Sequence, residues 1–156
     1  MKKEIILLLP HCLLNSRVRA EGLGREGTEE IVLGYLSRYS LPLFQLPCPE
    51  YLFIGRREKM TYDEYRKLPG YEDFLNKLAI SIRDYLRSIP LSPLVLGIRG
   101  SPSCSLSLVK GKEGWREGEG LFIRALKKTI AGIFLEVDYD DLEKSLRELD
   151  KWLRGE

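Results

Sequence analysis

The chain has 156 residues, of which 44% are hydrophobic and 31% are charged. This composition is typical of a soluble globular protein, and the length predicts a single domain over residues 1–156. The formal net charge of only +2 gives no argument for nucleic-acid binding. No apolar stretch approaches the roughly 18 residues that span a bilayer, and the opening apolar run is too short for a signal peptide. We therefore expect a cytoplasmic protein without a membrane partner.

Short apolar runs alternate with helical patterns along the chain, which predicts an α/β fold. The predicted strands cover residues 4–9, 42–46, 94–99 and 131–137. The predicted helices cover residues 28–40, 61–68, 71–89 and 121–129, and a last amphipathic helix begins at residue 140. We expect a three-layer domain with a mostly parallel sheet, strand order 2-1-3-4 and helices on both faces, flavodoxin-like or Rossmann-like.

The three cysteines of the chain occupy three separate motifs, each placed directly after a predicted strand. These motifs are PHCLLN with Cys12, PCPEYLFIG with Cys48 and GSPSCS with Cys104. The carboxyl ends of parallel strands meet at one edge of the sheet, so the cysteines are expected to converge on one crevice. For each of them, a buried thiol that binds nothing is the alternative.

Three convergent thiols in a reducing compartment indicate metal or redox chemistry rather than disulfides. The chain has no C-x2-C pair of the kind that structural zinc sites use, and the adjacent His11 and Cys12 rarely both reach one tetrahedral ion. A 4Fe-4S cluster suits the donor set better, because three thiolates hold three irons and leave the fourth open. The predicted cofactor is therefore a 4Fe-4S cluster on Cys12, Cys48 and Cys104.

As a set, CLLN, PCPEYL and GSPSCS resemble the motifs of the thiouracil desulfidase family, formerly a domain of unknown function. The resemblance spans roughly residues 4–110. It implies a small α/β domain, a 4Fe-4S cluster on the three cysteines, and a free iron that accepts sulfur from a thiolated pyrimidine. The first motif of that family usually carries a second cysteine and then Arg-Tyr-Asp-Gly. Here the region reads NSRVRAEGLG, which indicates a divergent branch.

Polar residues beside the cysteines are candidates for catalysis. Glu50 stands two residues after Cys48 and is assigned as a proton donor, with capping of the next turn as its alternative role. Ser101 and Ser103 precede Cys104 and are candidates to bind a pyrimidine's polar edge or the cluster sulfurs, or simply to stabilise a turn. We assign Glu50 and Ser101 as catalytic and Ser103 as substrate-binding.

The first cysteine loop supplies three further candidates for substrate binding. His11 is the only histidine, and either a proton shuttle or a hydrogen-bonded structural group fits it. Asn15 and Arg17 follow in the same loop, and Arg17 suits an anionic substrate group unless it is merely solvated. Arg56 and Arg57 carry the same ambiguity.

The glycine-rich segment 111–120 lacks the spacing of a phosphate-binding loop. It predicts either a mobile flap, with Trp115 as a lid over the crevice, or a surface hairpin.

The leading hypothesis is a desulfidase in which a thiocarbonyl sulfur binds the open iron while Glu50 and Ser101 manage the protons. The alternatives are a non-catalytic iron–sulfur or sulfide-carrier module that serves a partner enzyme, and a structural domain whose thiols bind nothing. A free thiopyrimidine, a thiolated tRNA nucleoside and inorganic sulfide all remain open as substrates.

Overall fold

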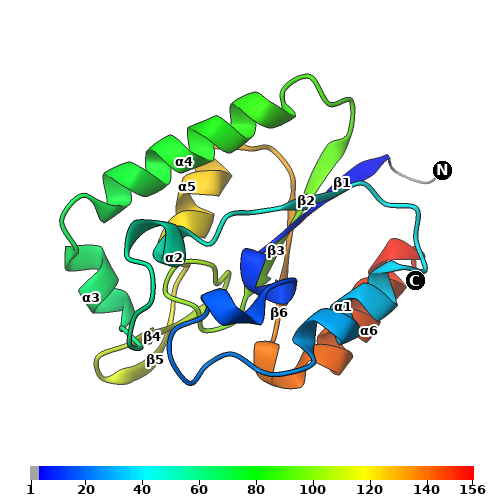
Figure 1. Ribbon diagram of the computed structural model, residues 1–156. Coiled ribbons are helices and arrows are strands. Elements are labelled where there is room, and N and C mark those ends of the chain that lie inside the picture. The colour runs from blue at the N-terminus through cyan, green and yellow to red at the C-terminus, as the bar shows by residue number, and fades with distance from the viewer. Residues whose placement is uncertain (1–3) are drawn as a thin grey trace.

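A parallel sheet of four strands forms the centre of the molecule (Figure 1). The computed structural model describes residues 4–156. Its sheet contains β1 (Ile5–Leu9), β2 (Leu43–Gln45), β3 (Ser92–Ile98) and β6 (Ile133–Val137). These strands lie in the order β2-β1-β3-β6, and every neighbouring pair is parallel. The predicted α/β class and strand order are confirmed.

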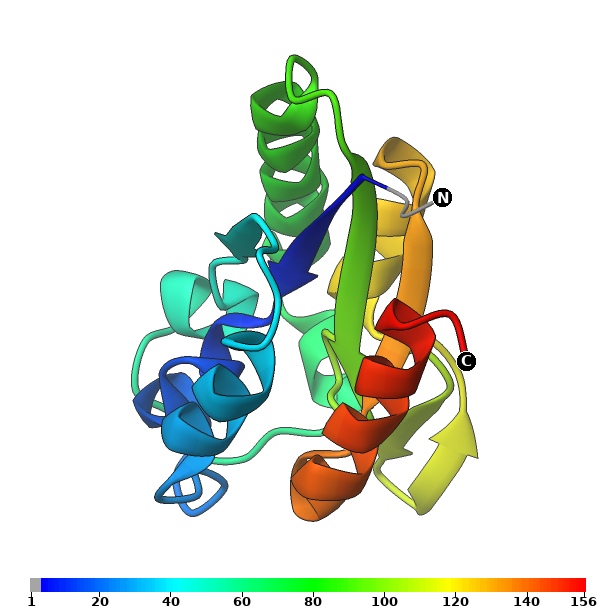
Figure 2. The ribbon, with the colours of Figure 1, turned by 90° about the vertical axis from the view of Figure 1, so that its right-hand side faces the viewer.

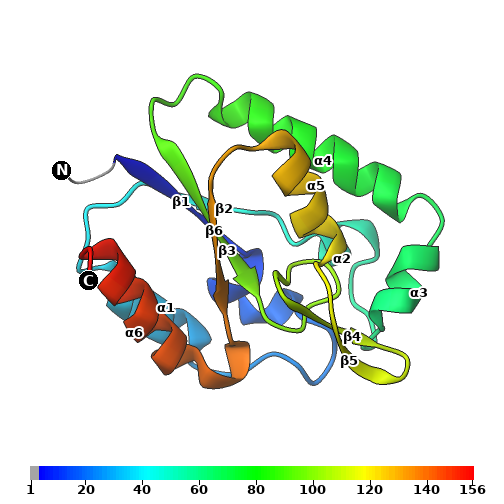
Figure 3. The same cartoon turned by 180° about the vertical axis from the view of Figure 1, so that it is seen from behind.

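Helices cover both faces of this sheet. The four longest are α1 (Thr28–Leu36), α4 (Tyr71–Leu86), α5 (Leu121–Thr129) and α6 (Leu142–Leu153). Helices α4 and α5 pack on one face and α1 and α6 on the other, as Figure 1 and the reverse view in Figure 3 show. The predicted three-layer arrangement is therefore present.

The fully apolar sequence of β1 explains how one strand serves two cores. Successive side chains of a strand point to opposite faces of the sheet. Ile6 and Leu8 enter the core beneath α4 and α5, whereas Ile5, Leu7 and Leu9 enter the core beneath α1 and α6. All five side chains are buried, as expected for a parallel strand covered on both faces.

Short elements gather around the end of the sheet at which the strands finish. They are η1 (His11–Leu13), η2 (Ser16–Val18), α2 (Pro49–Phe53), α3 (Tyr62–Lys67), β4 (Leu108–Gly111), β5 (Gly114–Glu117) and η3 (Tyr139–Asp141). In Figure 2, β1 and β3 run downwards to the end at which η3 and the hairpin of β4 and β5 lie. Binding sites of open α/β sheets form at this end.

Two of these short elements bear on the predictions. The predicted helices do not include residues 49–53, but Cys48 caps the five-residue helix α2 there. Pro49 takes the first helical position, where the missing amide hydrogen costs no intrahelical bond. Segment 111–120 contributes to an antiparallel hairpin, which agrees with the hairpin interpretation of this segment.

Local signals set the helix boundaries. The Thr61 hydroxyl accepts a hydrogen bond from the Glu64 amide, and the Glu64 carboxylate accepts one from the Thr61 amide, each over 3.3 Å. These two bonds form a capping box at the start of α3, within the predicted helix 61–68. Within residues 4–156, no helix has both the length and the apolar character to cross a membrane.

Candidate metal centre

The three cysteines line one pocket of about 230 Å³. Cys12 lies in η1 directly after β1, Cys48 caps α2 after β2, and Cys104 lies in the loop after β3. Glu50 and Ser101 line the same pocket. All three thiols are free and partly buried. The strand order thus brings together residues that lie up to 92 positions apart (104 minus 12) in the sequence.

The loop that carries Cys104 folds back tightly onto the end of β3. The Cys104 carbonyl accepts a hydrogen bond of 2.7 Å from the Ile98 amide. A Cβ atom at Gly97 would stand 2.6 Å from that carbonyl oxygen, so only glycine permits this approach. The Ser101 hydroxyl oxygen accepts hydrogen bonds from the amides of Cys104 (3.0 Å) and Ser103 (3.3 Å). Ser101 therefore stabilises the turn and also lines the pocket.

Burial makes the thiols poor acids in the metal-free protein. It raises the pKa of the Cys12 thiol to about 12, an effect that nearby Arg19 opposes and Cys48 adds to. Burial also raises the pKa of Cys48, and it raises that of Cys104 well above its ordinary value, with further contributions from Cys48 and Glu50. The Cys48 thiolate thus disfavours ionisation of both Cys12 and Cys104, which is a situation that a bound cation relieves.

The donor set fits a cluster better than a single ion. Within residues 4–156, no three His, Cys, Asp or Glu side chains are gathered closely enough to hold one metal ion. Three sulfur donors in one pocket also fall short of the four protein ligands that a structural zinc site normally has. In an iron–sulfur cluster each thiolate binds a different iron, so the donors stand apart around a common cavity. Three free thiols around one pocket fit that requirement.

Basic side chains outnumber acidic ones around this pocket. The basic residues that line it are Arg19, Arg25, Arg57, Lys59, Arg99 and Lys110, and the acidic ones are Glu50, Asp138 and Asp140. A cluster held by three thiolates carries negative charge, and cationic surroundings stabilise such a group. The local charge is therefore compatible with the same cofactor.

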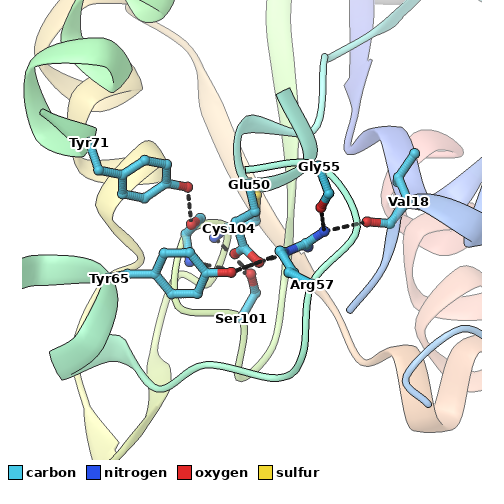
Figure 4. Close-up of polar contacts among 9 residues, drawn as sticks. Val18, Glu50, Gly55, Arg57, Tyr65, Tyr71, Ser101 and Cys104 are labelled. Carbon is cyan, nitrogen blue, oxygen red and sulfur yellow. Dashed lines mark hydrogen bonds and ion pairs between the residues drawn. The ribbon is translucent and has the colours of Figure 1, made fainter. Parts of the chain in front are cut away.

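Glu50 belongs to a buried network of hydrogen bonds (Figure 4). Its Oε1 atom accepts hydrogen bonds of 2.9 Å from the Arg57 guanidinium and 2.9 Å from the Tyr65 hydroxyl. Arg57 also donates to the Val18 carbonyl over 2.9 Å. Burial alone would lower the pKa of Arg57, but the Glu50 carboxylate raises it above its ordinary value, so this guanidinium stays charged. The carboxyl group that was assigned from sequence is thus fixed in position by an arginine that sequence left ambiguous.

Ser103 faces away from the pocket lining. It is fully buried, and its hydroxyl shares a hydrogen bond of 2.7 Å with the Tyr71 hydroxyl. Burial raises the pKa of Tyr71, so this hydroxyl remains protonated. The structure thereby gives the Ser103 hydroxyl a protein partner on α4, and its assignment as substrate-binding stays a prediction.

The remaining substrate-binding candidates lie beside the pocket. The lining described by residues 4–156 does not include His11, Asn15 or Arg17. The side-chain nitrogen Nδ2 of Asn15 lies 3.4 Å from the His11 ring nitrogen Nε2. The side-chain oxygen Oδ1 of Asn15 accepts a hydrogen bond of 3.3 Å from the backbone amide of Arg17. Arg17 instead lines a neighbouring, more open hollow of about 680 Å³. These three substrate assignments stay predictions.

A second set of contacts, which sequence reasoning missed, holds the first cysteine loop over the pocket. The guanidinium carbon of Arg19 lies 3.9 Å from the centre of the Tyr139 ring, and the Tyr139 hydroxyl donates to the Cys12 carbonyl over 3.5 Å. Arg25 forms an ion pair with Asp140. These pairs are more than 100 residues apart in sequence, so only the fold reveals them.

Comparisons with known proteins place the chain near two others. It is 31% identical over 159 residues to the uncharacterised protein MJ0003 of Methanocaldococcus jannaschii, across 97% of this chain and 100% of that protein. It also resembles the solved structure of the 4Fe-4S-dependent thiouracil desulfidase TudS, with a TM-score of 0.56 and 21% identity. That match covers 96% of this chain and 99% of the other and shows a shared fold. No family model matches the chain.

Proposed function

The chain belongs to the same protein family as MJ0003 of Methanocaldococcus jannaschii, and from its thiol-lined pocket we propose that it is an iron–sulfur-dependent desulfidase. Its substrate is a thiolated pyrimidine base or nucleoside, which loses its sulfur in exchange for oxygen. One observation carries the proposal: three free cysteines from three separate loops line a single pocket together with Glu50 and Ser101. The fold shared with a thiouracil desulfidase supports the same proposal.

Cys12, Cys48 and Cys104 hold the cofactor in this proposal. When it is bound, a 4Fe-4S cluster with three protein ligands supplies an open, Lewis-acidic iron that accepts sulfur. The chain has no fourth cysteine to close that position. The loops that carry the thiols are fixed by the Ile98 to Cys104 hydrogen bond and by the Tyr139 contact to Cys12, which holds the donors in place before the cofactor arrives.

Glu50 and Ser101 accept and donate the protons in this proposal. Within residues 4–156, both hydrogen bonds to the Glu50 carboxylate are made to Oε1, so Oε2 is the oxygen available to a water molecule or a substrate. The Ser101 oxygen accepts two amide hydrogen bonds, which leaves its own hydroxyl proton free to donate into the pocket. A carboxylate and a hydroxyl donor beside one cavity are suited to activating water and protonating a leaving group.

The test is sulfide release from 2-thiouracil by the full chain after anaerobic reconstitution with iron and sulfide. We expect each protein molecule to release more than one hydrosulfide and to form uracil. Glu50→Gln retains an acceptor for Arg57 and Tyr65 but removes the carboxylate charge, so we expect it to remain folded at reduced stability and to lose sulfide release by roughly 100-fold or more. Arg56→Gln, on the exposed neighbour of Arg57, is the matched control and should keep full activity.

Two outcomes would count against the proposal. A reconstituted, cluster-containing protein that releases no sulfide from 2-thiouracil or from 4-thiouridine would favour the carrier module instead. Full activity of the Glu50→Gln variant would show that the reaction does not use this carboxylate.

A further inference from the structure

Trp115 is a large apolar side chain that remains 60% exposed although it lies beside the cysteines. It stands on β5 and lines the same pocket as Cys12, Cys48 and Cys104. A buried aromatic side chain would be explained by the core, but an exposed one at the rim of a pocket needs another reason. Its place at the pocket indicates that the exposed ring serves to contact the ligand of the pocket.

The hairpin that carries Trp115 is tied to the body of the protein at two places. The Gly100 amide donates a hydrogen bond of 3.0 Å to the Leu108 carbonyl at the start of β4. On the opposite side, the Asp63 carboxylate accepts hydrogen bonds from the Lys112 amide (2.9 Å) and from the Arg116 guanidinium (3.1 Å). The indole is thus presented by an anchored hairpin, which reduces the entropy lost when a ligand packs against it.

The indole ring itself rests against the loop of the cysteine pocket. A Cβ atom at Gly100 would lie 2.4 Å from Cζ3 and 2.5 Å from Cη2 of Trp115. Gly100 has a φ angle of +82°, so glycine suits this position for two reasons. The six-membered edge of the indole is therefore seated on the backbone that leads directly to Ser101.

Trp115 is also the pocket's available aromatic surface. Among the described residues that line the pocket, Tyr139 is the only other aromatic one. Tyr139 is only 4% exposed, and Arg19 lies over its ring. The side chain of Trp115, by contrast, is mostly exposed to solvent.

We infer that Trp115 is the residue against which the flat ring of the substrate stacks, and that it selects conjugated heterocycles over saturated ones. This inference rests on the proposed function, because the ring is that of the pyrimidine. Stacking of a base on an aromatic side chain tolerates different ring substituents, since every base offers a π face. A base and its nucleoside would both be accepted, whereas a puckered ring with the same polar edge would be rejected.

The experiment compares the binding of uracil and 5,6-dihydrouracil by calorimetry, on the full chain as purified and after anaerobic reconstitution. The two ligands share their carbonyl and amide groups, and only uracil is flat and conjugated. We expect the protein to bind uracil about tenfold more tightly, and Trp115→Leu to abolish that preference. Trp115→Phe should restore part of it, and Trp152→Phe, on the far helix α6, should leave it unchanged.

The inference is overturned if Trp115→Leu keeps the preference for uracil, or if the unmodified chain binds the two rings equally or binds neither. Sulfide release from 2-thiouracil judges the proposed reaction separately. A preference for uracil that depends on Trp115, in a protein that releases no sulfide, would support the stacking residue and refute the reaction.

Discussion

The cysteine pocket has two walls that are built in opposite ways. One, the charged wall, consists of Glu50 and Arg57, which hydrogen-bond to each other and to the buried Tyr65 in the protein interior. The other, the hairpin wall, consists of Gly100 and Trp115, where the indole stays largely exposed. Buried, mutually bonded groups hold one geometry, whereas an exposed ring adapts to what packs on it. The charged wall therefore suits a fixed chemical role, and the hairpin wall suits recognition.

The largest expected effect comes from removing the charge that supports Glu50. Arg57→Met leaves the buried carboxylate without its cation, and we expect a loss of about 3–5 kcal/mol in the free energy of unfolding. Arg56→Met alters the exposed neighbour and should cost no more than about 0.5 kcal/mol. Urea denaturation of both variants measures the difference. Equal stabilities would mean that the charged wall is not a coupled network.

Arg56 and Arg57 also show a difference that could not be predicted from the sequence. The sequence FIGRREK contains two equivalent arginines, and only the turn after α2 decides that Arg57 meets Glu50 and Tyr65 while Arg56 stays exposed. The strands, by contrast, follow from apolar runs alone, and their order was predictable because parallel crossovers allow few arrangements. Helix α2 was not predicted, because Pro47 and Pro49 flank Cys48 and proline disfavours a helix interior, although it fits the first helical position that Pro49 takes.

The sequence also predicted that the cysteines, Glu50 and Ser101 would share one site, because each follows the end of a strand. It assigned Ser101 as catalytic and Ser103 as substrate-binding, but it did not reveal the hydrogen bond of Ser103 to Tyr71. These two hydroxyls differ only in which way the turn points them, one towards the pocket and one towards Tyr71. Such a difference depends on tertiary packing, which the sequence pattern does not reveal.

A smaller effect is expected behind the charged wall, at the pair formed by Tyr71 and Ser103. Tyr71→Phe leaves the fully buried Ser103 hydroxyl without its partner, at a cost of about 1–3 kcal/mol in unfolding free energy. The double variant Tyr71→Phe with Ser103→Ala removes both polar groups, so it should be more stable than Tyr71→Phe alone. Thermal and urea unfolding of the three proteins provide the comparison. If the second substitution adds a further loss instead, Ser103 has a role beyond this hydrogen bond.

The hairpin wall is probed by Gly100→Ala. The new methyl group must displace the Trp115 ring, and the positive φ adds strain of about 1–2 kcal/mol. Gly27 has a similar φ of +84° but open space around it, so Gly27→Ala is a control with the same strain and no collision. In a Trp152→Phe background, only Gly100→Ala should shift the tryptophan fluorescence and reduce the preference for uracil. A shift of the same size in both variants would show that backbone strain alone is responsible.

The smallest expected effect concerns how firmly the hairpin is anchored. Asp63→Ala removes the acceptor for the Lys112 amide and for Arg116. Because Asp63 lies at the surface, we expect no measurable change in Tm but faster hydrogen exchange of the Lys112 amide. Unchanged exchange would indicate that the bond between Gly100 and Leu108 suffices to hold the hairpin.

Cluster assembly on the three thiols is the central claim, and iron content tests it most directly. After anaerobic reconstitution and gel filtration, the full chain should contain about four irons and about four sulfides and absorb near 400 nm. Cys12→Ser, Cys48→Ser and Cys104→Ser should each lose most of that iron while remaining folded. Iron-free wild-type protein, or three variants that all retain the cluster, would contradict the account.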